Sequence, residues 1–150
     1  MNLQVIHYSS LTKDQLYQLL YLRIQVFVVE QNCPYQELDD LDKIAYHVLG
    51  SVGQSLISVG RIIPYEKENK VLIGRISVNE NHRKNGYALE MMREIISFIN
   101  TDFPSFKIAL SAQTYLKEFY SSLGFKTQGE PYLEDGIPHV YMIKNSNFTQ

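Results

Sequence analysis

Residues 71–100 read VLIGRISV, NENHRKN and GYALEMMREIISFIN, and this stretch decides the fold. The apolar run at 71–78 predicts a strand, the polar run at 79–85 predicts a loop, and helical spacing predicts a helix from Gly86 to about residue 100. One stripe of that helix is apolar and consists of Leu89, Met92, Ile96 and Ile99. The first N–H groups of a helix have no partner within the helix and carry partial positive charge. A strand–loop–helix turn of this kind is therefore suited to bind a phosphate group.

Outward from this stretch, helices and strands alternate along the chain. Upstream, Thr12 and Gln15 form the T-x-x-Q pattern of a capping box, which predicts a helix that frays at the β-branched run from Val26 to Val29. Downstream, apolar spacing predicts a helix over residues 114–123, followed by a left-handed C-cap at Gly124. Further strands are expected near residues 3–8, 45–52, 55–63, 107–113, 126–130 and 138–144. Helices interleaved with strands predict an α/β (α+β mixed sheet) fold with helices packed against the sheet.

The composition is typical of a single globular domain, expected to cover residues 1–150, with 45% hydrophobic and 20% charged residues. The net charge of −2 gives no basic footprint, so no nucleic-acid partner is expected. Cys33 is the one cysteine, which excludes an internal disulfide and a cysteine-rich zinc site, and no other metal-ligand cluster is expected. The start of the chain lacks the pattern of a signal peptide, and the apolar stretch Leu16 to Val29 is too short to span a bilayer. A cytoplasmic protein without a membrane partner is expected.

The loop at residues 83–88, Arg-Lys-Asn-Gly-Tyr-Ala, has the pattern R-x-x-G-x-A. Gly86 lets the backbone approach an anion closely, and Arg83 and Lys84 add positive charge. The loop has neither the G-x-x-x-x-G-K-[ST] pattern nor the G-x-G-x-x-G pattern. Taken alone, it fits a phosphate-binding loop or an ordinary strand–helix turn with exposed basic side chains.

Three motifs together resemble the GNAT superfamily of N-acetyltransferases: the strand VLIGRISV, the R-x-x-G-x-A loop, and L-x-x-F-Y-x-x-L-G-F at residues 116–125. The N-terminal half is similar to the ElaA-type branch, through L-R-x-x-V-F-V-V-E-Q-x-C-P-Y at 22–35, E-x-D-D-L-D at 37–42 and His47. The resemblance covers about residues 10–143. It implies a GNAT-like acyl-CoA N-acyltransferase fold, in which a central, mostly antiparallel sheet has helices on both faces.

The resemblance also implies a reaction, the direct transfer of an acetyl group from acetyl-CoA to a primary amine of a small molecule or peptide. In the family, an R/Q-x-x-G-x-G/A loop binds the pyrophosphate of acetyl-CoA, and the pantetheine arm lies along the preceding strand. The acetyl-CoA-binding residues implied for this chain are Ile76, Ser77, Val78, Arg83, Lys84, Asn85, Gly86, Tyr87 and Ala88. No metal is implied, and a homodimer is a further expectation. The alternative is a catalytically silent acyl-CoA-binding module with a regulatory or interaction role.

Candidates for proton transfer are few. Tyr120 is the candidate general acid, because a phenol with an ordinary pKa of about 10 is protonated at pH 7 and can protonate a departing thiolate. Its place on the apolar stripe of its helix also fits a core residue. The candidate bases are Glu30, His47 and His139, since a base must take a proton from the attacking amine. Their alternatives are a salt-bridged acid for Glu30 and structural roles for the histidines.

Arg61 and Arg75 are the candidate substrate-binding residues, because a guanidinium group on the acceptor side could bind a carboxylate. Strand alternation predicts that Arg75 shares a face with Ile73 and Ser77. The alternative for both arginines is an exposed or edge-facing side chain. The acidic run at residues 37–42 fits either attraction of a cationic amine or a solvated loop.

Overall fold

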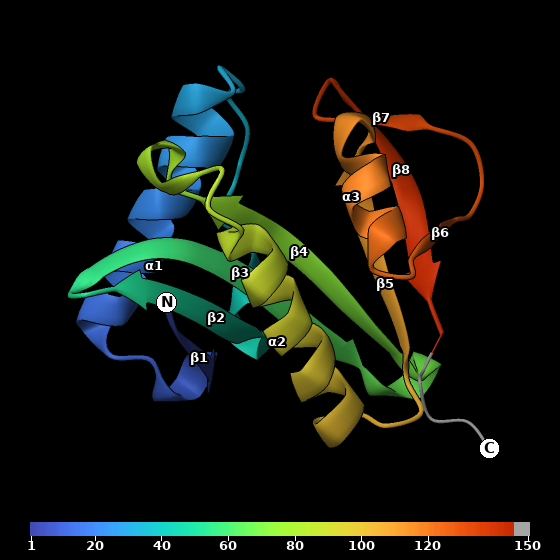
Figure 1. Cartoon of the computed structure of the whole chain (residues 1–150), viewed down its shortest axis with the longest axis horizontal. Helices are drawn as coiled ribbons and strands as arrows, with labels where there is room; N and C mark the ends of the chain where they lie inside the picture. Colours follow the sequence, from blue (N-terminus) through green and yellow to red (C-terminus); the bar gives the residue numbers. More distant parts are fainter. Residues whose placement is uncertain (146–150) are drawn as a thin grey trace. The chain divides into compact units, whose positions relative to one another are not determined.

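A computed structural model describes residues 1–145. These residues form two compact units. The first holds Met1–Ile63 and Arg75–Ser97, and the second holds Pro64–Gly74 and the described residues from Phe98 on. Three elements have residues in both units: β3 (Ser55–Tyr65), β4 (Lys70–Val78) and α2 (Tyr87–Asp102) (Figure 1).

The first unit is a sheet in which the strand order is β1-β2-β3-β4, with β1 at Asn2–His7 and β2 at Tyr46–Val52. Strand β2 is antiparallel to both β1 and β3, and Val48 lies opposite Val5 and Gly60. Helix α1 (Lys13–Ile24) continues directly into a π-helical turn, Gln25–Glu30. The chain also forms short 3-10 helices at Tyr8–Ser10, Asp40–Ile44, Glu66–Glu68, Glu80–His82 and Thr114–Leu116.

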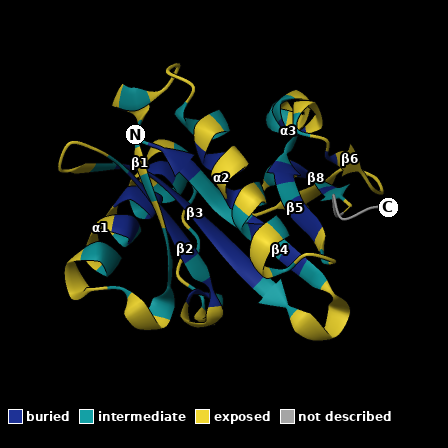
Figure 2. Cartoon of the chain, turned by 60° about the horizontal axis from the view of Figure 1, so that its bottom comes forward, coloured by how far each residue is buried: buried dark blue, intermediate teal, exposed yellow. Residues whose placement is uncertain are grey.

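Helices cover both faces of the sheet of the first unit. On one face, buried side chains of α1 and of the π-helical turn pack with Leu49 and Val59. Figure 2 shows the strands of this sheet as largely buried. On the other face, a Cβ atom at Gly60 would lie 2.9 Å from Ile76 Cδ1 and 3.2 Å from Ile95 Cδ1. The absence of a side chain at Gly60 therefore lets residues of β4 and α2 meet across β3. This packing holds the middle of α2 against β3 beside Ile76 of β4.

The second unit contains the only parallel strand pair described in residues 1–145, in which β4 residues 70–73 pair with β5 (Lys107–Gln113). Strand β8 (Ile137–Lys144) is antiparallel to β5, and it also pairs with β6 (Lys126–Thr127) and β7 (Tyr132–Glu134). Helix α3 (Lys117–Ser122) precedes Phe125, whose buried ring packs edge-on against the ring of Tyr120.

The mixed, mostly antiparallel α/β fold predicted from the sequence is confirmed. The capping box is also confirmed, since the Gln15 N–H donates to Thr12 Oγ1 at 3.1 Å and the Thr12 N–H donates to Gln15 Oε1 at 2.9 Å. The predicted fraying at Val26 to Val29 is wrong, because this run stays helical in the π-helical turn. Strand β7 was not predicted, because three residues are too few to show a period of two.

Candidate functional site

The loop before α2 presents an open glycine at the start of a helix. Lys84 and Gly86 have φ angles of +66° and +79°, and a Cβ atom at Gly86 would meet nothing within 4 Å. The Glu90 N–H donates to the Gly86 carbonyl at 3.0 Å, which closes the first turn of α2. The N–H groups of residues 87–89 therefore have no hydrogen-bond acceptor within the helix. The structure thus places the predicted residues Lys84 to Ala88 where an anion can approach backbone N–H groups.

The side chain of Asn85 holds the loop in shape. Its Nδ2 donates to the carbonyl oxygens of His82 at 3.0 Å and of Arg83 at 3.1 Å. These bonds close the loop onto its own backbone, so the amide of Asn85 stabilises the turn.

Arg83 lies in an ion pair that the sequence motifs do not indicate. Its Nη1 and Nη2 donate to the Glu30 carboxylate at 2.5 and 2.8 Å, and its Nε donates to the Val78 carbonyl at 2.9 Å. The hydrogen bonds from Arg83 lower the pKa of the Glu30 carboxyl below its ordinary value. The structure therefore brings a candidate base together with a predicted phosphate-binding residue, and the two charges neutralise each other.

The end of β4 carries the remaining predicted acetyl-CoA-binding residues. Ser77 and Val78 are both buried, and the Ser77 hydroxyl makes no hydrogen bond within residues 1–145. The predicted alternation is interrupted at Arg75, whose φ of +53° lies in the left-handed region that non-glycine residues rarely adopt.

Arg61 and Arg75 belong to a network of buried and half-buried charges, which we call the arginine–carboxylate network. It consists of Arg23, Arg61, Arg75, Glu37, Asp39 and Asp42. Its centre is Arg23, which is 1% exposed and donates to Glu37 at 2.9 and 3.0 Å and to Asp42 at 2.7 and 3.1 Å. The solvated-loop alternative for residues 37–42 is therefore wrong at Glu37 and Asp42, which are 2% and 5% exposed.

The two predicted substrate-binding arginines extend this network. Arg61 Nη1 donates to Asp39 at 2.7 Å and to Asp42 at 2.9 Å. Arg75 Nε lies 2.6 Å from Glu37 Oε2, and its Nη2 donates to the Glu37 carbonyl at 2.8 Å. Carboxylates of the chain itself thus already contact both guanidinium groups.

His47 is buried beside the same network. It is 1% exposed, and its Nε2–H donates to the Asp42 carbonyl at 2.9 Å. Burial lowers the pKa of His47 below its ordinary value, although the hydrogen bond to Asp42 acts in the opposite direction. Burial alone would raise the pKa of the Asp42 carboxyl, but hydrogen bonds and charges of Arg23 and Arg61 outweigh it and lower that pKa. His47 is thus a neutral, enclosed imidazole.

In the second unit, Tyr120 is 6% exposed and its ring packs edge-on against Phe119 and Phe125. Burial, with a smaller contribution from Tyr115, raises the pKa of Tyr120 to about 12. The phenol is therefore protonated at neutral pH, which a general acid requires.

His139 lies among polar side chains of β5 and of the β7–β8 hairpin. Its Nδ1–H donates to the Ile137 carbonyl at 2.6 Å, and its Nε2 lies 3.6 Å from Glu134 Oε2. The ring stacks on Tyr132, whose hydroxyl bonds Ser111 Oγ. The bond to Ile137 fixes the tautomer, so the Nε2 of the neutral ring is the nitrogen that can accept a proton.

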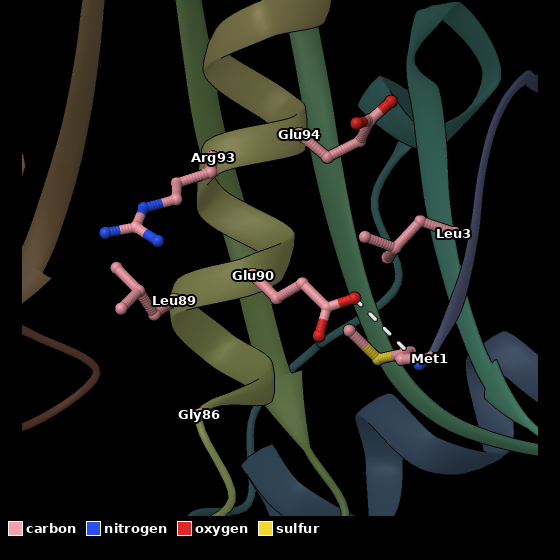
Figure 3. Close-up of a pocket in the computed structure, with 7 residues that line it drawn as sticks. All are labelled: Met1, Leu3, Gly86, Leu89, Glu90, Arg93 and Glu94. Carbon is pink, nitrogen blue, oxygen red and sulfur yellow. Dashed lines mark ion pairs between the residues drawn. The ribbon is translucent and has the colours of Figure 1, made fainter.

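A cavity of about 640 Å³ lies in the first unit, beside Gly86. Figure 3 shows Leu89 and Arg93 projecting from one side of α2, with Glu90 and Glu94 directed toward Met1 and Leu3. Two carboxylates, one guanidinium and the N-terminal ammonium of Met1, which lies 3.9 Å from Glu90 Oε2, line this cavity. Its charges therefore balance, and the lining gives no specific site for a phosphate.

Residues 1–145 contain no group of three or more His, Cys, Asp or Glu side chains placed to hold a metal ion. None of their helices is long and apolar enough to cross a membrane.

The comparison with known families decides the classification. Residues 10–146 match the family described as "Acetyltransferase (GNAT) domain". The chain belongs to the GNAT family. Membership of this family supports acyl-CoA-dependent N-acyltransferase activity, and it confirms the resemblance on which the site residues were predicted.

Relatives of this GNAT chain include protein ElaA of Escherichia coli, which is 40% identical over 144 residues that cover 94% of each chain. The crystal structure of E. coli ElaA superimposes with a TM-score of 0.91 at 38% identity, covering 96% of this chain and 99% of that one. The crystal structure of an acyl-CoA N-acyltransferase from Pseudomonas aeruginosa superimposes with a TM-score of 0.91 at 35% identity, covering 95% and 98%. The predicted similarity to the ElaA-type branch is thereby confirmed.

Sequence reasoning on the GNAT motifs missed the partners of the site residues. It did not predict the contact of Glu30 with Arg83 or of His139 with Glu134. A signal for the second contact was present, because the turn at Asp135-Gly136 folds β7 back on β8 and places Glu134 opposite Ile137. No local signal in the sequence indicates the contact of Glu30 with Arg83.

Proposed function

We propose that this GNAT chain transfers an acetyl group directly from acetyl-CoA to a primary amine of a small molecule or peptide. The observation that carries the proposal is the open, left-handed Gly86 at the start of α2, next to N–H groups that the helix leaves unpaired. The relative from P. aeruginosa is named as an acyl-CoA N-acyltransferase, which supports a CoA-linked donor.

The donor would be held by the loop and by the end of β4. Backbone N–H groups of residues 84–88 would bind the pyrophosphate, with Lys84 as a nearby positive charge. Backbone groups of Ile76 and Val78 would complete this contact and polarise the thioester carbonyl, as in an oxyanion hole.

The chemistry needs two proton transfers and no covalent enzyme intermediate. The amine nitrogen attacks the thioester carbonyl carbon, the C–N bond forms, and the C–S bond breaks as the tetrahedral intermediate collapses. Tyr120 would give its phenolic proton to the departing thiolate, since its phenol is protonated at neutral pH. A base takes the proton that the amine loses.

Among the three candidate bases, the contacts favour His139. His47 is enclosed and its Nε2–H is already bonded to the Asp42 carbonyl. Glu30 is held by Arg83, which lowers its pKa and makes it a weak base. The bond from Nδ1–H to the Ile137 carbonyl fixes the tautomer of His139 and leaves its Nε2 without an attached proton, 3.6 Å from Glu134 Oε2. Recognition of a substrate carboxylate by Arg61 or Arg75 stays a prediction, and their ion pairs do not favour it.

Calorimetric titration of the protein with acetyl-CoA tests the proposal. Wild type is expected to bind with micromolar affinity, and Gly86→Glu is expected to lose binding because it brings bulk and negative charge to the loop. Gly86→Ala separates charge from backbone strain, since its Cβ meets nothing within 4 Å. Gly53→Glu is the matched control, because Gly53 also has a positive φ and open space and lies in the β2–β3 turn. Absence of binding by folded wild type at millimolar acetyl-CoA would refute the proposal.

A further inference from the structure

We propose that Glu30 is a positioning residue for the donor: it holds Arg83, and Arg83 in turn orients the last peptide group of β4. The inference rests on the proposed function, because it concerns how the donor site is built. It assigns Glu30 a role other than base, and Arg83 a role other than direct phosphate ligand.

All three nitrogens of the Arg83 guanidinium donate hydrogen bonds within the chain. Its Nη1 and Nη2 donate to the two carboxylate oxygens of Glu30, and its Nε donates to the Val78 carbonyl. A bidentate arginine–carboxylate pair fixes orientation as well as distance. Three of the five N–H donors of Arg83 are therefore held within the chain, in an orientation fixed by Glu30 and Val78.

The peptide group that joins Val78 to Asn79 is held by hydrogen bonds at both of its polar ends. Its carbonyl oxygen accepts from Arg83 Nε at 2.9 Å, and its N–H donates to the Ile57 carbonyl at 2.8 Å. Both polar ends of one planar group are thus occupied, so the group cannot rotate without breaking a hydrogen bond. The direction of this plane sets where the backbone of β4 points as it enters the loop.

Both the backbone and the side chain of Arg83 are held by hydrogen bonds. Asn85 Nδ2 donates to its backbone carbonyl, while Glu30 holds its side chain. Glu30 itself ends the π-helical turn Gln25–Glu30, which is continuous with α1. The ion pair therefore ties a helix of the N-terminal half to the loop at the start of α2.

One substitution, Glu30→Gln, separates three roles. If Arg83 bound phosphate directly, Glu30 would compete for the guanidinium, and its removal would tighten CoA binding. If Glu30 were the general base, kcat would fall with the KM for acetyl-CoA unchanged. If Glu30 positions Arg83, CoA binding weakens and the KM for acetyl-CoA rises more than kcat falls.

The experiment compares wild type, Glu30→Gln and Arg83→Lys, using titration with CoA and steady-state kinetics with acetyl-CoA. Because the pair is partly exposed, we expect CoA affinity to fall about three- to tenfold in each variant. Arg83→Lys keeps the charge but loses the forked donors, so it would preserve binding if charge alone mattered. Glu30→Asp is expected to be intermediate, and Glu66→Gln, an exposed acid in the Glu66–Glu68 turn, is expected to match wild type.

A second readout does not depend on CoA. In the free protein, Glu30→Gln is expected to speed hydrogen exchange in peptides that span residues 79–86, while its melting temperature stays close to that of wild type. Unchanged exchange, or CoA binding that is equal to or tighter than wild type, would overturn the inference. Failure of wild type to bind CoA would instead overturn the proposed function, and the exchange result would still decide the positioning role.

Discussion

Tyr120 combines two properties that the sequence offered as alternatives. Its ring packs against Phe119 and Phe125, as a core residue does. Burial of the phenol raises its pKa to about 12, so the hydroxyl is protonated at neutral pH, as a proton donor must be. A core ring and a catalytic hydroxyl are compatible, because the ring can pack while only the oxygen reaches the reacting atoms.

Tyr120→Phe is expected to lower kcat about a hundredfold or more, because general acid catalysis contributes roughly 10²–10⁴ in rate. CoA affinity is expected to stay unchanged, since the ring and its packing remain. The measurement is thiol release in steady state together with calorimetric CoA binding. Tyr115→Phe is the control, because Tyr115 is 75% exposed on the adjoining turn. Full activity of Tyr120→Phe would show that Tyr120 is a core residue and not the general acid.

The segment from Glu37 to Ile44 is held in place by arginines from three elements. Arg23 comes from α1, Arg61 from β3 and Arg75 from β4, and each contacts a carboxylate of the segment. Removal of one partner from a buried ion pair leaves an uncompensated charge, which costs far more than an exposed pair is worth. The arginine–carboxylate network therefore anchors this acidic segment to the first unit through the buried carboxylates of Glu37 and Asp42.

Arg23→Met is expected to lower the free energy of unfolding by up to about 3–5 kcal/mol, because Glu37 and Asp42 each lose a buried ion pair and keep only Arg75 and Arg61 as partners. The matched control is Lys43→Met, which removes an ion pair to Asp40 from the same segment. That pair is at the surface, with Lys43 65% exposed, and its loss is expected to have little effect. Urea denaturation measures both. Equal stabilities of the two variants would contradict the buried role of Arg23.

The free energy of unfolding is expected to fall as the pH is lowered. Burial lowers the pKa of His47 in the folded state, so the unfolded chain takes up a proton there first as pH falls below about 6.5. Asp42 and Glu30 also have lowered pKa values, so they favour the folded state until pH falls through their ordinary range near 4. Both effects remove stability on acidification.

We expect the free energy of unfolding to fall between pH 7 and pH 5, by at most about 1.4 kcal/mol per pH unit for His47. His47→Gln is expected to flatten this slope, because glutamine can donate to the Asp42 carbonyl but does not titrate. His7→Gln, which changes a histidine outside the arginine–carboxylate network, is expected to keep it. Chemical denaturation at a series of pH values gives the slopes, and identical slopes in His47→Gln and wild type would exclude His47 as the source.

The local sequence pattern was sufficient to predict the strand, loop and helix at residues 71–100, because each signal lies within one helical turn or one strand. It was insufficient for the arginine–carboxylate network, because Arg61 lies far along the chain from Asp39, and no spacing rule joins them. The left-handed Arg75 had no signal either, since arginine carries no preference for that conformation. Single-domain organisation, a homodimer and a cytoplasmic location stay predictions of the sequence.

The contact between Glu30 and Arg83 has an evolutionary consequence. The family loop begins with arginine or glutamine, and a glutamine in place of Arg83 could still donate to the Val78 carbonyl but could not form a forked ion pair. A carboxylate at position 30 would then have no partner. Across relatives of this chain, positions 30 and 83 are therefore expected to covary: acid accompanies arginine, and acid is lost where glutamine begins the loop.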